Sequence, residues 1–284
     1  MNAHNDPIAG DDINLQAYLQ RIGYAGPLDP GFDLLATLVE RHLANIPFEA
    51  IDVMLGCGVD LDPTAIDRKL LDGHRGGYCF EHASLMRRAL RAIGFSVRQN
   101  LGRVWNHGSL DGPTPAATHA CLKVEADGRA WLVDVGFGGN TPDQPLAWQP
   151  DVAQATRYNT YRLVETRDGL RLESRLQDRW SPLYEILDFH WQPVDFKLAN
   201  HYTATFPTSH FRHRLGVALT EPQVRTTLSG NRLRQRTVDG THSESTLDVP
   251  GLADALATRF GLPVADDWIP LLERVVAETD EENT

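Results

Sequence analysis

The spacing of apolar residues changes near Gly94, and this change does most to limit the folds open to the chain. Up to that glycine, apolar residues recur at the three- and four-residue intervals of amphipathic helices. Beyond it, alternating runs are separated by turn residues, which is the pattern of antiparallel strands. The sequence therefore predicts a helical region over residues 1–94, followed by a barrel or a curled sheet. The predicted elements are helices at 13–22, 32–43, 63–71 and 79–93 and strands at 95–105, 118–125, 130–136, 158–166 and 170–176.

The last third of the chain has a mixed pattern. Helical spacing runs from Pro193 to Tyr202, and strand patterns follow as far as Leu247. Two further helices are predicted at 251–259 and 266–278. No internal repeat or low-complexity linker separates these stretches, so we expect them to pack on one another.

Composition excludes several classes of protein. The 284 residues are 42% hydrophobic and 23% charged, as in ordinary globular proteins. The net charge of −11 argues against nucleic acid or an anionic membrane as the main partner. No apolar run approaches the ~20 residues of a membrane span, and the N-terminus lacks the pattern of a signal peptide. Three cysteines without scaffold or zinc-ligand spacing suit a reducing compartment, so we expect a cytoplasmic protein that binds no metal.

Cys79 is the strongest candidate for a reactive group. It follows the glycine turn Arg75-Gly76-Gly77 in the segment RGGYCFEH, at the start of a predicted helix. A helix N-terminus offers unpaired backbone N–H groups and a partial positive charge, which favour the nucleophilic thiolate. Most free cysteines are instead small buried hydrophobes, so the residue type alone does not decide its role.

A hairpin further along the chain supplies partners for this thiol. Asp127-Gly128 between two alternating runs predicts a two-residue turn, which pairs positions whose numbers sum to 255. His119 then faces Gly136, and Asp134 is the diagonal neighbour of His119 on the same face, at roughly 7–8 Å between backbones. An imidazole and a carboxylate can meet in this register, whereas a three-residue loop would change the parity.

Together, Cys79, His119 and Asp134 supply a nucleophile, a base and a residue that orients the base. Cys121 is a rival nucleophile, because the same register puts it opposite Asp134 and on the face of His119. We favour Cys79, since the N–H groups around a strand cysteine are engaged in the ladder and those at a helix start are free. The helical region and the sheet must pack together to form this site, which predicts a cleft between them.

These motifs resemble those of the arylamine N-acetyltransferases. The family carries an R-G-G-Y-C-F-E segment, a later Thr-His pair and an Asp that opens D-V-G-F-G, and all three are present here. The match extends to Ile46-Pro47-Phe48-Glu49 before the cysteine and to 195–202 and 205–211 after it, so it covers most of the chain in order. Two positions depart from the pattern, Ala50 and Ala83, where family members commonly carry Asn.

The resemblance implies an α+β fold of three parts, with the Cys-His-Asp cleft between the first two. A helical bundle at 1–94 would carry the nucleophile, and a β-barrel at 95–192 would carry the histidine and the aspartate. An α/β lid at 193–284, with an interdomain helix, would complete the molecule.

The resemblance also implies where the ligands bind. A bare glycine segment is weak evidence, but in this family coenzyme A and its acyl group would contact Thr118, Gly136, Phe137, Gly138, Gly139 and Phe211. A flat aromatic acceptor would lie among Phe48, Phe137 and Phe211. Residues 201–240 are basic within an acidic chain and could attract the phosphates of coenzyme A through six arginines, Arg212, Arg214, Arg225, Arg232, Arg234 and Arg236.

The predicted activity is acetyl transfer from acetyl-coenzyme A to the nitrogen of arylamines or arylhydrazines. Cys79 would carry the acetyl group as a thioester in a ping-pong reaction, and no metal would take part. Two enzyme alternatives keep the same three residues: a thiol amidohydrolase or peptidase, and a macrolactam-forming amide synthase. A third alternative is a non-catalytic binding protein, for which an unreactive Cys79 would be the signature. The sequence leaves open whether the protein forms a homodimer.

Overall fold

Helices dominate as far as Gly94 and strands follow, as the sequence predicts. The computed structural model describes residues 12–105, 110–176 and 178–282. Its helices are α1 (Leu15–Arg21), α2 (Phe32–Asn45), α3 (Ile51–Met54), α4 (Pro63–Asp67), α5 (Cys79–Ile93), α6 (Pro193–Thr205), α7 (His210–His213), α8 (Val249–Thr258) and α9 (Ile269–Glu282), with shorter turns η1 (Arg68–Asp72), η3 (Gly138–Asn140) and η4 (Asp266–Trp268). No helix among the described residues is long and apolar enough to cross a membrane.

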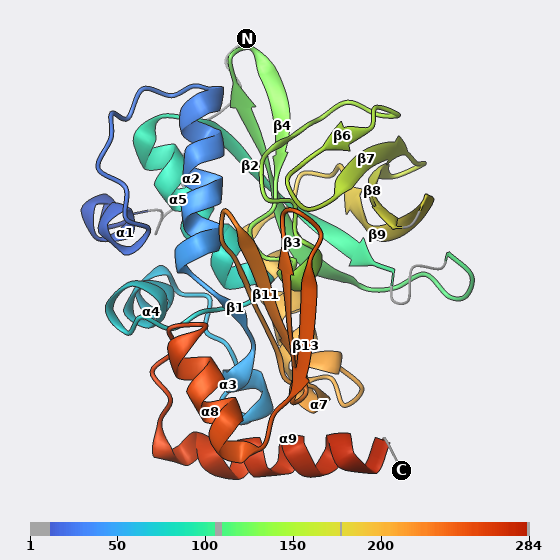
Figure 1. Ribbon diagram of the computed structural model, residues 1–284. Helices are drawn as coiled ribbons and strands as arrows, with labels where there is room; N and C mark the ends of the chain where they lie inside the picture. Colours follow the sequence, from blue (N-terminus) through green and yellow to red (C-terminus); the bar gives the residue numbers. More distant parts are fainter. Residues whose placement is uncertain (1–11, 106–109, 177, 283–284) are drawn as a thin grey trace.

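The strands form two antiparallel sheets. One sheet has eight strands in the order β5 (Leu146–Ala147), β4 (Arg129–Val133), β3 (Ala117–Ala126), β2 (Ser96–Val104), β9 (Arg179–Leu187), β8 (Gly169–Leu176), β7 (Thr160–Glu165) and β6 (Gln154–Ala155), and it curls into a nearly closed barrel. The other has five strands in the order β1 (Phe48–Glu49), β10 (Gly216–Thr220), β11 (Val224–Ser229), β12 (Arg232–Thr237) and β13 (His242–Thr246). In Figure 1 this second sheet stands beside the barrel, with α8 and α9 at its lower end.

The helix that begins at Cys79 has clear start and stop signals. Tyr78 precedes it in an extended conformation, and the Glu81 carboxylate accepts the Tyr78 backbone N–H at 3.0 Å. Gly94 ends the helix in the left-handed region, at φ 115°, which favours glycine. The apolar face of α5 is buried in the main core and packs against β2 and β3. Cys79 is therefore the first residue of the helix, as the sequence predicts.

The β3–β4 hairpin has the predicted register but is shorter than predicted. Leu122 pairs with Val133 and Lys123 with Leu132, so the paired numbers sum to 255. Strand β4 ends at Val133, and Gly136 is therefore not paired with His119. Other elements also differ from the prediction. The predicted helix at 63–71 is α4 followed by the π-helical turn η1, and strand β9 was not among the strands predicted.

Packing ties the three stretches of sequence together. Strand β1 belongs to the five-stranded sheet, where Phe48 pairs with Ala218 and Glu49 with Val217. A second hydrophobic cluster joins Ile51 of α3 to α8, α9 and the same sheet. The barrel interior forms a third cluster, which includes Cys121. Residues next to the nucleophile thus pack directly against the C-terminal part of the chain.

Candidate active site

Cys79 lies where the helical region meets the barrel. Cys79 is 3% exposed, and its Sγ lies 3.7 Å from the carbonyl oxygen of Thr118 on β3. The loop after β4 passes so close that a Cβ added to Gly136 would sit 2.7 Å from the Cys79 Cα. Only glycine fits at this contact. The first residue of α5 also has a backbone N–H with no partner within the helix.

His119 connects the thiol to a buried carboxylate. Its Nε2 lies 2.8 Å from Oδ2 of Asp134, and both residues are almost fully buried. Burial lowers the pKa of His119, but the Asp134 charge and hydrogen bond, together with the contact with Cys79, raise that pKa to about 10. With Nε2 directed at Asp134, Nδ1 is the nitrogen left for the thiol. The charged imidazolium is therefore the favoured form of His119 in this environment.

Asp134 is held by donors on three sides. Besides His119, the Tyr184 hydroxyl donates to Oδ2 at 2.7 Å and the Gly136 backbone N–H donates to Oδ1 at 2.9 Å. Burial raises the pKa of Asp134, but these donors and the charge of His119 outweigh it, and the net shift is downward. Sequence analysis did not find Tyr184, because it lies on β9 and no local motif links it to the aspartate.

Cys121, the rival nucleophile, has a different environment. It is 1% exposed and lies among apolar side chains of the barrel interior. Burial, followed by the charges of Asp134 and Cys79, raises the pKa of the Cys121 thiol well above its ordinary value. This thiol therefore lacks the activation that the start of α5 offers to Cys79.

The aromatic residues predicted for the acceptor lie close to these groups. The Phe137 ring meets the His119 ring edge-on, with centroids 5.0 Å apart. Phe48 and Phe211 have ring centroids 6.2 Å apart, and Phe211 also meets Tyr78, which precedes the nucleophile, at 5.6 Å. Phe48, Phe137 and Phe211 are each partly exposed and come from separate segments, which meet around His119 and Tyr78.

The glycine loop joins the two groups of aromatic residues. Gly138 has φ +79°, and a Cβ there would lie 3.3 Å from the Phe48 ring. Gly139 is exposed, and Thr118 is partly exposed beside Cys79. The six residues predicted to contact coenzyme A therefore all lie on segments that border the nucleophile.

Comparisons of the sequence and of the fold with known proteins point to one family. The N-acetyltransferase family model matches residues 32–269. The chain is 40% identical over 257 residues to the arylamine N-acetyltransferase of Mycobacterium tuberculosis, covering 89% of this chain and 91% of that relative. The structure matches that of Mycobacterium marinum arylamine N-acetyltransferase in complex with CoA with a TM-score of 0.87, at 39% identity, covering 93% of this chain and 98% of the other. The corresponding enzyme of Salmonella typhimurium gives a TM-score of 0.87 at 36% identity, with coverage of 93% and 98%.

The chain belongs to the arylamine N-acetyltransferase family. Membership makes it an enzyme of the acyltransferase class and confirms the family and fold that the sequence motifs predict. The binding-protein, hydrolase and amide-synthase alternatives are not favoured by these matches.

In this member of the family, a buried ionic network supports the nucleophile turn. Arg75 binds Glu49 at 2.8 Å and Asp52 at 2.9 Å, and Lys69 binds Asp52 at 2.7 Å and Glu81 at 2.8 Å. The second oxygen of Glu81 caps α5 through Tyr78 N–H. These ion pairs stabilise the turn that precedes α5, because breaking one would leave a buried charge without its partner.

The arginines of 201–240 differ in their surroundings. Arg225 is buried and binds backbone carbonyls of the glycine loop, and Arg236 binds the Tyr158 carbonyl and Asn159. Arg234 forms an ion pair with Glu244. Arg212 and Arg214 donate to the Thr205 carbonyl and to Ser229. Arg225 is buried, whereas Arg212, Arg214 and Arg234 are exposed, so the attraction of this segment for the phosphates of coenzyme A stays a prediction.

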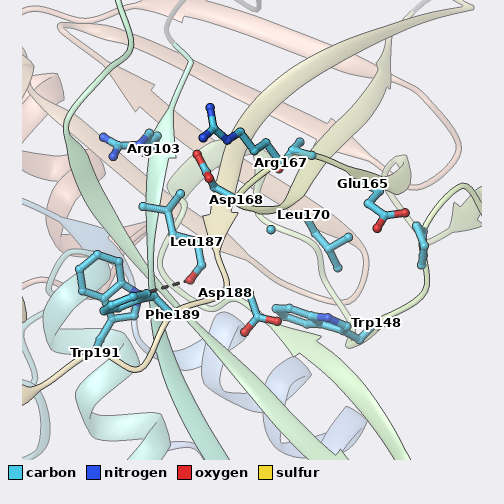
Figure 2. A pocket seen from close by; sticks show the side chains of 13 residues that line it. Arg103, Trp148, Glu165, Arg167, Asp168, Leu170, Leu187, Asp188, Phe189 and Trp191 are labelled. Atoms are coloured by element: carbon cyan, nitrogen blue, oxygen red, sulfur yellow. Dashed lines mark hydrogen bonds between the residues drawn. The ribbon is translucent and has the colours of Figure 1, made fainter.

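A pocket of about 770 Å³ lies apart from the nucleophile, beside the β7–β8 turn and the end of β9. Figure 2 shows Arg167 and Asp168 at one end of it and Trp148, Phe189 and Trp191 at the other. None of the residues that line it is a predicted catalytic or ligand residue. The residues that line this pocket include no cysteine and no histidine, so it is not a candidate for chemistry through a thiol.

Proposed function

We propose that the protein transfers the acetyl group of acetyl-coenzyme A to arylamines and arylhydrazines by way of a thioester on Cys79. The observation that carries this proposal is the contact of a helix-start thiol with a histidine that is itself bound to a buried carboxylate. The chain's membership of the arylamine N-acetyltransferase family supports the choice of donor and acceptor.

In the first half-reaction, His119 holds the thiol proton. The raised pKa of His119 supports this assignment, and Asp134 keeps its ring oriented. The Cys79 sulfur attacks the thioester carbonyl, and the bond between that carbonyl and the coenzyme sulfur breaks. The coenzyme thiolate leaves with the proton from His119. The backbone N–H of Cys79 is the donor we assign to the oxyanion.

In the second half-reaction, the acceptor nitrogen attacks the acetyl group on Cys79. Neutral His119 takes the proton of the amine as the new carbon–nitrogen bond forms. The bond to the Cys79 sulfur then breaks, which restores the thiolate and the imidazolium. Phe48, Phe137 and Phe211 support a flat aromatic acceptor, since they are partly exposed, Phe137 contacts His119 and Phe211 contacts both Phe48 and Tyr78.

We also propose that Thr118 and the loop from Gly136 to Gly139 contact the acyl donor, together with Phe211. The close approach of Gly136 to Cys79 and the exposure of Gly139 support this assignment. All three cysteines are free, and a reaction through a reduced thiol supports action in the cytoplasm.

Mass spectrometry tests the acetyl-enzyme directly. We expect one acetyl group on Cys79 after brief incubation with acetyl-coenzyme A, and its loss when an arylamine is added. Cys57, which is exposed, and Cys121, which is buried, act as internal controls in the peptide map. The matched variant Cys79→Ala should fold normally and take up no acetyl group.

Two results would contradict the proposal. Acetylation of Cys121 instead of Cys79 would mean that the nucleophile is the cysteine inside the barrel. Rapid alkylation of Cys79 by iodoacetamide, without transfer from acetyl-coenzyme A, would show that the Cys79 thiol is activated but that the enzyme uses another acyl donor.

A further inference from the structure

Arg225 binds the loop that follows the catalytic aspartate. It lies on β11 and is 4% exposed. Its Nη1 donates to the Gly139 carbonyl at 3.2 Å and its Nη2 to the Thr141 carbonyl at 2.8 Å. Its Nε donates to the Thr220 hydroxyl at 3.2 Å. All three nitrogens of the Arg225 guanidinium thus take part in joining the five-stranded sheet to the loop.

The charge of Arg225 makes this attachment strong. Among the described residues, its hydrogen-bond partners are the hydroxyls of Thr220 and Tyr161 and two carbonyls, and none is a carboxylate. Its Cζ also lies 4.6 Å from the centre of the Tyr158 ring, whose hydroxyl is fixed by the Glu221 carbonyl at 2.6 Å. A buried cation that lost its carbonyl partners would be left unpaired, so moving the loop away is costly.

The hydrogen bonds divide the loop into two parts. The Tyr161 hydroxyl donates to the carbonyls of Asn140 and Thr141, each at 3.2 Å, and the Thr141 hydroxyl donates to the Asp134 carbonyl at 3.0 Å. Thr141, next to Asp134 in the fold, therefore keeps two other hydrogen bonds when its bond from Arg225 is lost. The Gly139 carbonyl depends on Arg225, and Gly139 is the exposed residue of the loop.

We propose that Arg225 is a positioning residue for the acyl donor, which fixes the Gly138–Gly139 backbone against coenzyme A without taking part in the chemistry at Cys79. This inference rests on the proposed function, because it assumes that the donor lies along the glycine loop. It predicts that loss of Arg225 slows the acetylation of Cys79 by a donor that contacts the glycine loop. Acetylation by a donor without such contacts should stay nearly unchanged, since the triad keeps its own hydrogen bonds.

The test compares two acyl donors on the same variants. Arg225→Met removes the charge, and Arg225→Lys keeps the charge but loses the fork. The rate of Cys79 acetylation is measured with acetyl-coenzyme A and with p-nitrophenyl acetate, which has no coenzyme portion. We expect the rate constant with acetyl-coenzyme A to fall ~10-fold or more in Arg225→Met, while that with p-nitrophenyl acetate stays within about twofold. Arg225→Lys should lie between wild type and Arg225→Met.

Arg175→Met is the matched control. Arg175 lies on β8 outside the basic segment, its side chain is 48% exposed, and its partner is Asp178. This variant should behave as wild type with both donors. The melting temperature of every variant is measured alongside, so that loss of fold is recognised.

Three outcomes would overturn the inference. Equal losses with both donors would mean that Arg225 acts on the triad, and no loss with acetyl-coenzyme A would mean that it positions nothing the donor needs. Failure of both Arg225 variants to fold would assign the residue to stability alone. Failure of the wild-type protein to accept acetyl from acetyl-coenzyme A is a separate result, which defeats the proposed function itself.

Discussion

Asp134 shows how much of the site depends on individual hydrogen bonds. The carboxylate is buried and receives its donors from His119, Tyr184 and the Gly136 backbone. These bonds fix the carboxylate in the position that orients the imidazole, and they hold its pKa down despite burial. The Tyr184 hydroxyl is the donor that a single substitution removes with the least change in shape.

Tyr184→Phe should therefore slow Cys79 acetylation about tenfold without unfolding the protein, because a hydrogen bond to a charged group contributes about 1.5–3 kcal/mol. The rate is measured by mass spectrometry with acetyl-coenzyme A. Tyr202→Phe is the matched control, since Tyr202 is 40% exposed and its ring stacks on Phe206. An unchanged rate in Tyr184→Phe would show that the other donors alone hold Asp134.

At the scale of elements, a chain of hydrogen bonds joins α1, α2 and α5 behind the nucleophile. Nε2 of His82 lies 3.2 Å from the Pro47 carbonyl, which can only accept, so this nitrogen carries the proton. Nδ1 of His82 must then accept from Nε2 of His42 at 2.8 Å, and Nδ1 of His42 accepts from the Tyr18 hydroxyl at 3.1 Å. Both imidazoles are neutral in this arrangement.

This chain should make the protein less stable in acid. Burial lowers the pKa of His82 to about 4, and burial together with the neighbouring His82 and Arg21 lowers the pKa of His42 well below its ordinary value. The unfolded chain, with ordinary pKa values near ~6.5, then binds more protons between pH 4 and 6.5. The free energy of unfolding should fall as pH decreases through this range, by at most about 1.4 kcal/mol per pH unit for His82.

Urea unfolding at several pH values measures this effect. His82→Gln is the test variant, because glutamine keeps an N–H donor for the Pro47 carbonyl and does not titrate. Its stability should depend less steeply on pH between 4 and 6.5 than that of wild type. Parallel curves for the two proteins would mean that His82 does not supply the acid sensitivity.

The elements that sequence could predict are those set by local signals. A glycine turn followed by Glu81 marks the start of α5, and Asp127-Gly128 fixes the register that brings His119 near Asp134. Other features depend on residues far apart in sequence. The two-residue strand β1 exists only because β10 lies beside it, and Arg225 reaches a loop more than 80 positions earlier. No local pattern encodes such contacts, so structure was needed to find them.

For the whole molecule, the question is whether the three predicted parts fold separately. The division into 1–94, 95–192 and 193–284 stays a prediction. The contacts point to strong coupling, because β1 pairs with β10 and Ile51 lies in the cluster formed by α8 and α9. The Arg75 guanidinium, which also binds Glu49, lies 4.6 Å from the centre of the Trp268 ring. The C-terminal part thus contacts the turn that supports Cys79.

Leu272→Ala tests this coupling far from the chemistry. Leu272 is fully buried on α9 in the cluster that includes Ile51, and truncating a buried leucine costs about 2–5 kcal/mol. We expect one unfolding transition, shifted to lower urea, in which helical circular dichroism and the alkylation pattern of Cys79 change together. Leu198→Ala is the matched control, since Leu198 is 68% exposed and its loss should change stability by less than about 0.5 kcal/mol. A transition in which Cys79 keeps its native reactivity after the C-terminal helices have unfolded would show that the lid is an independent unit.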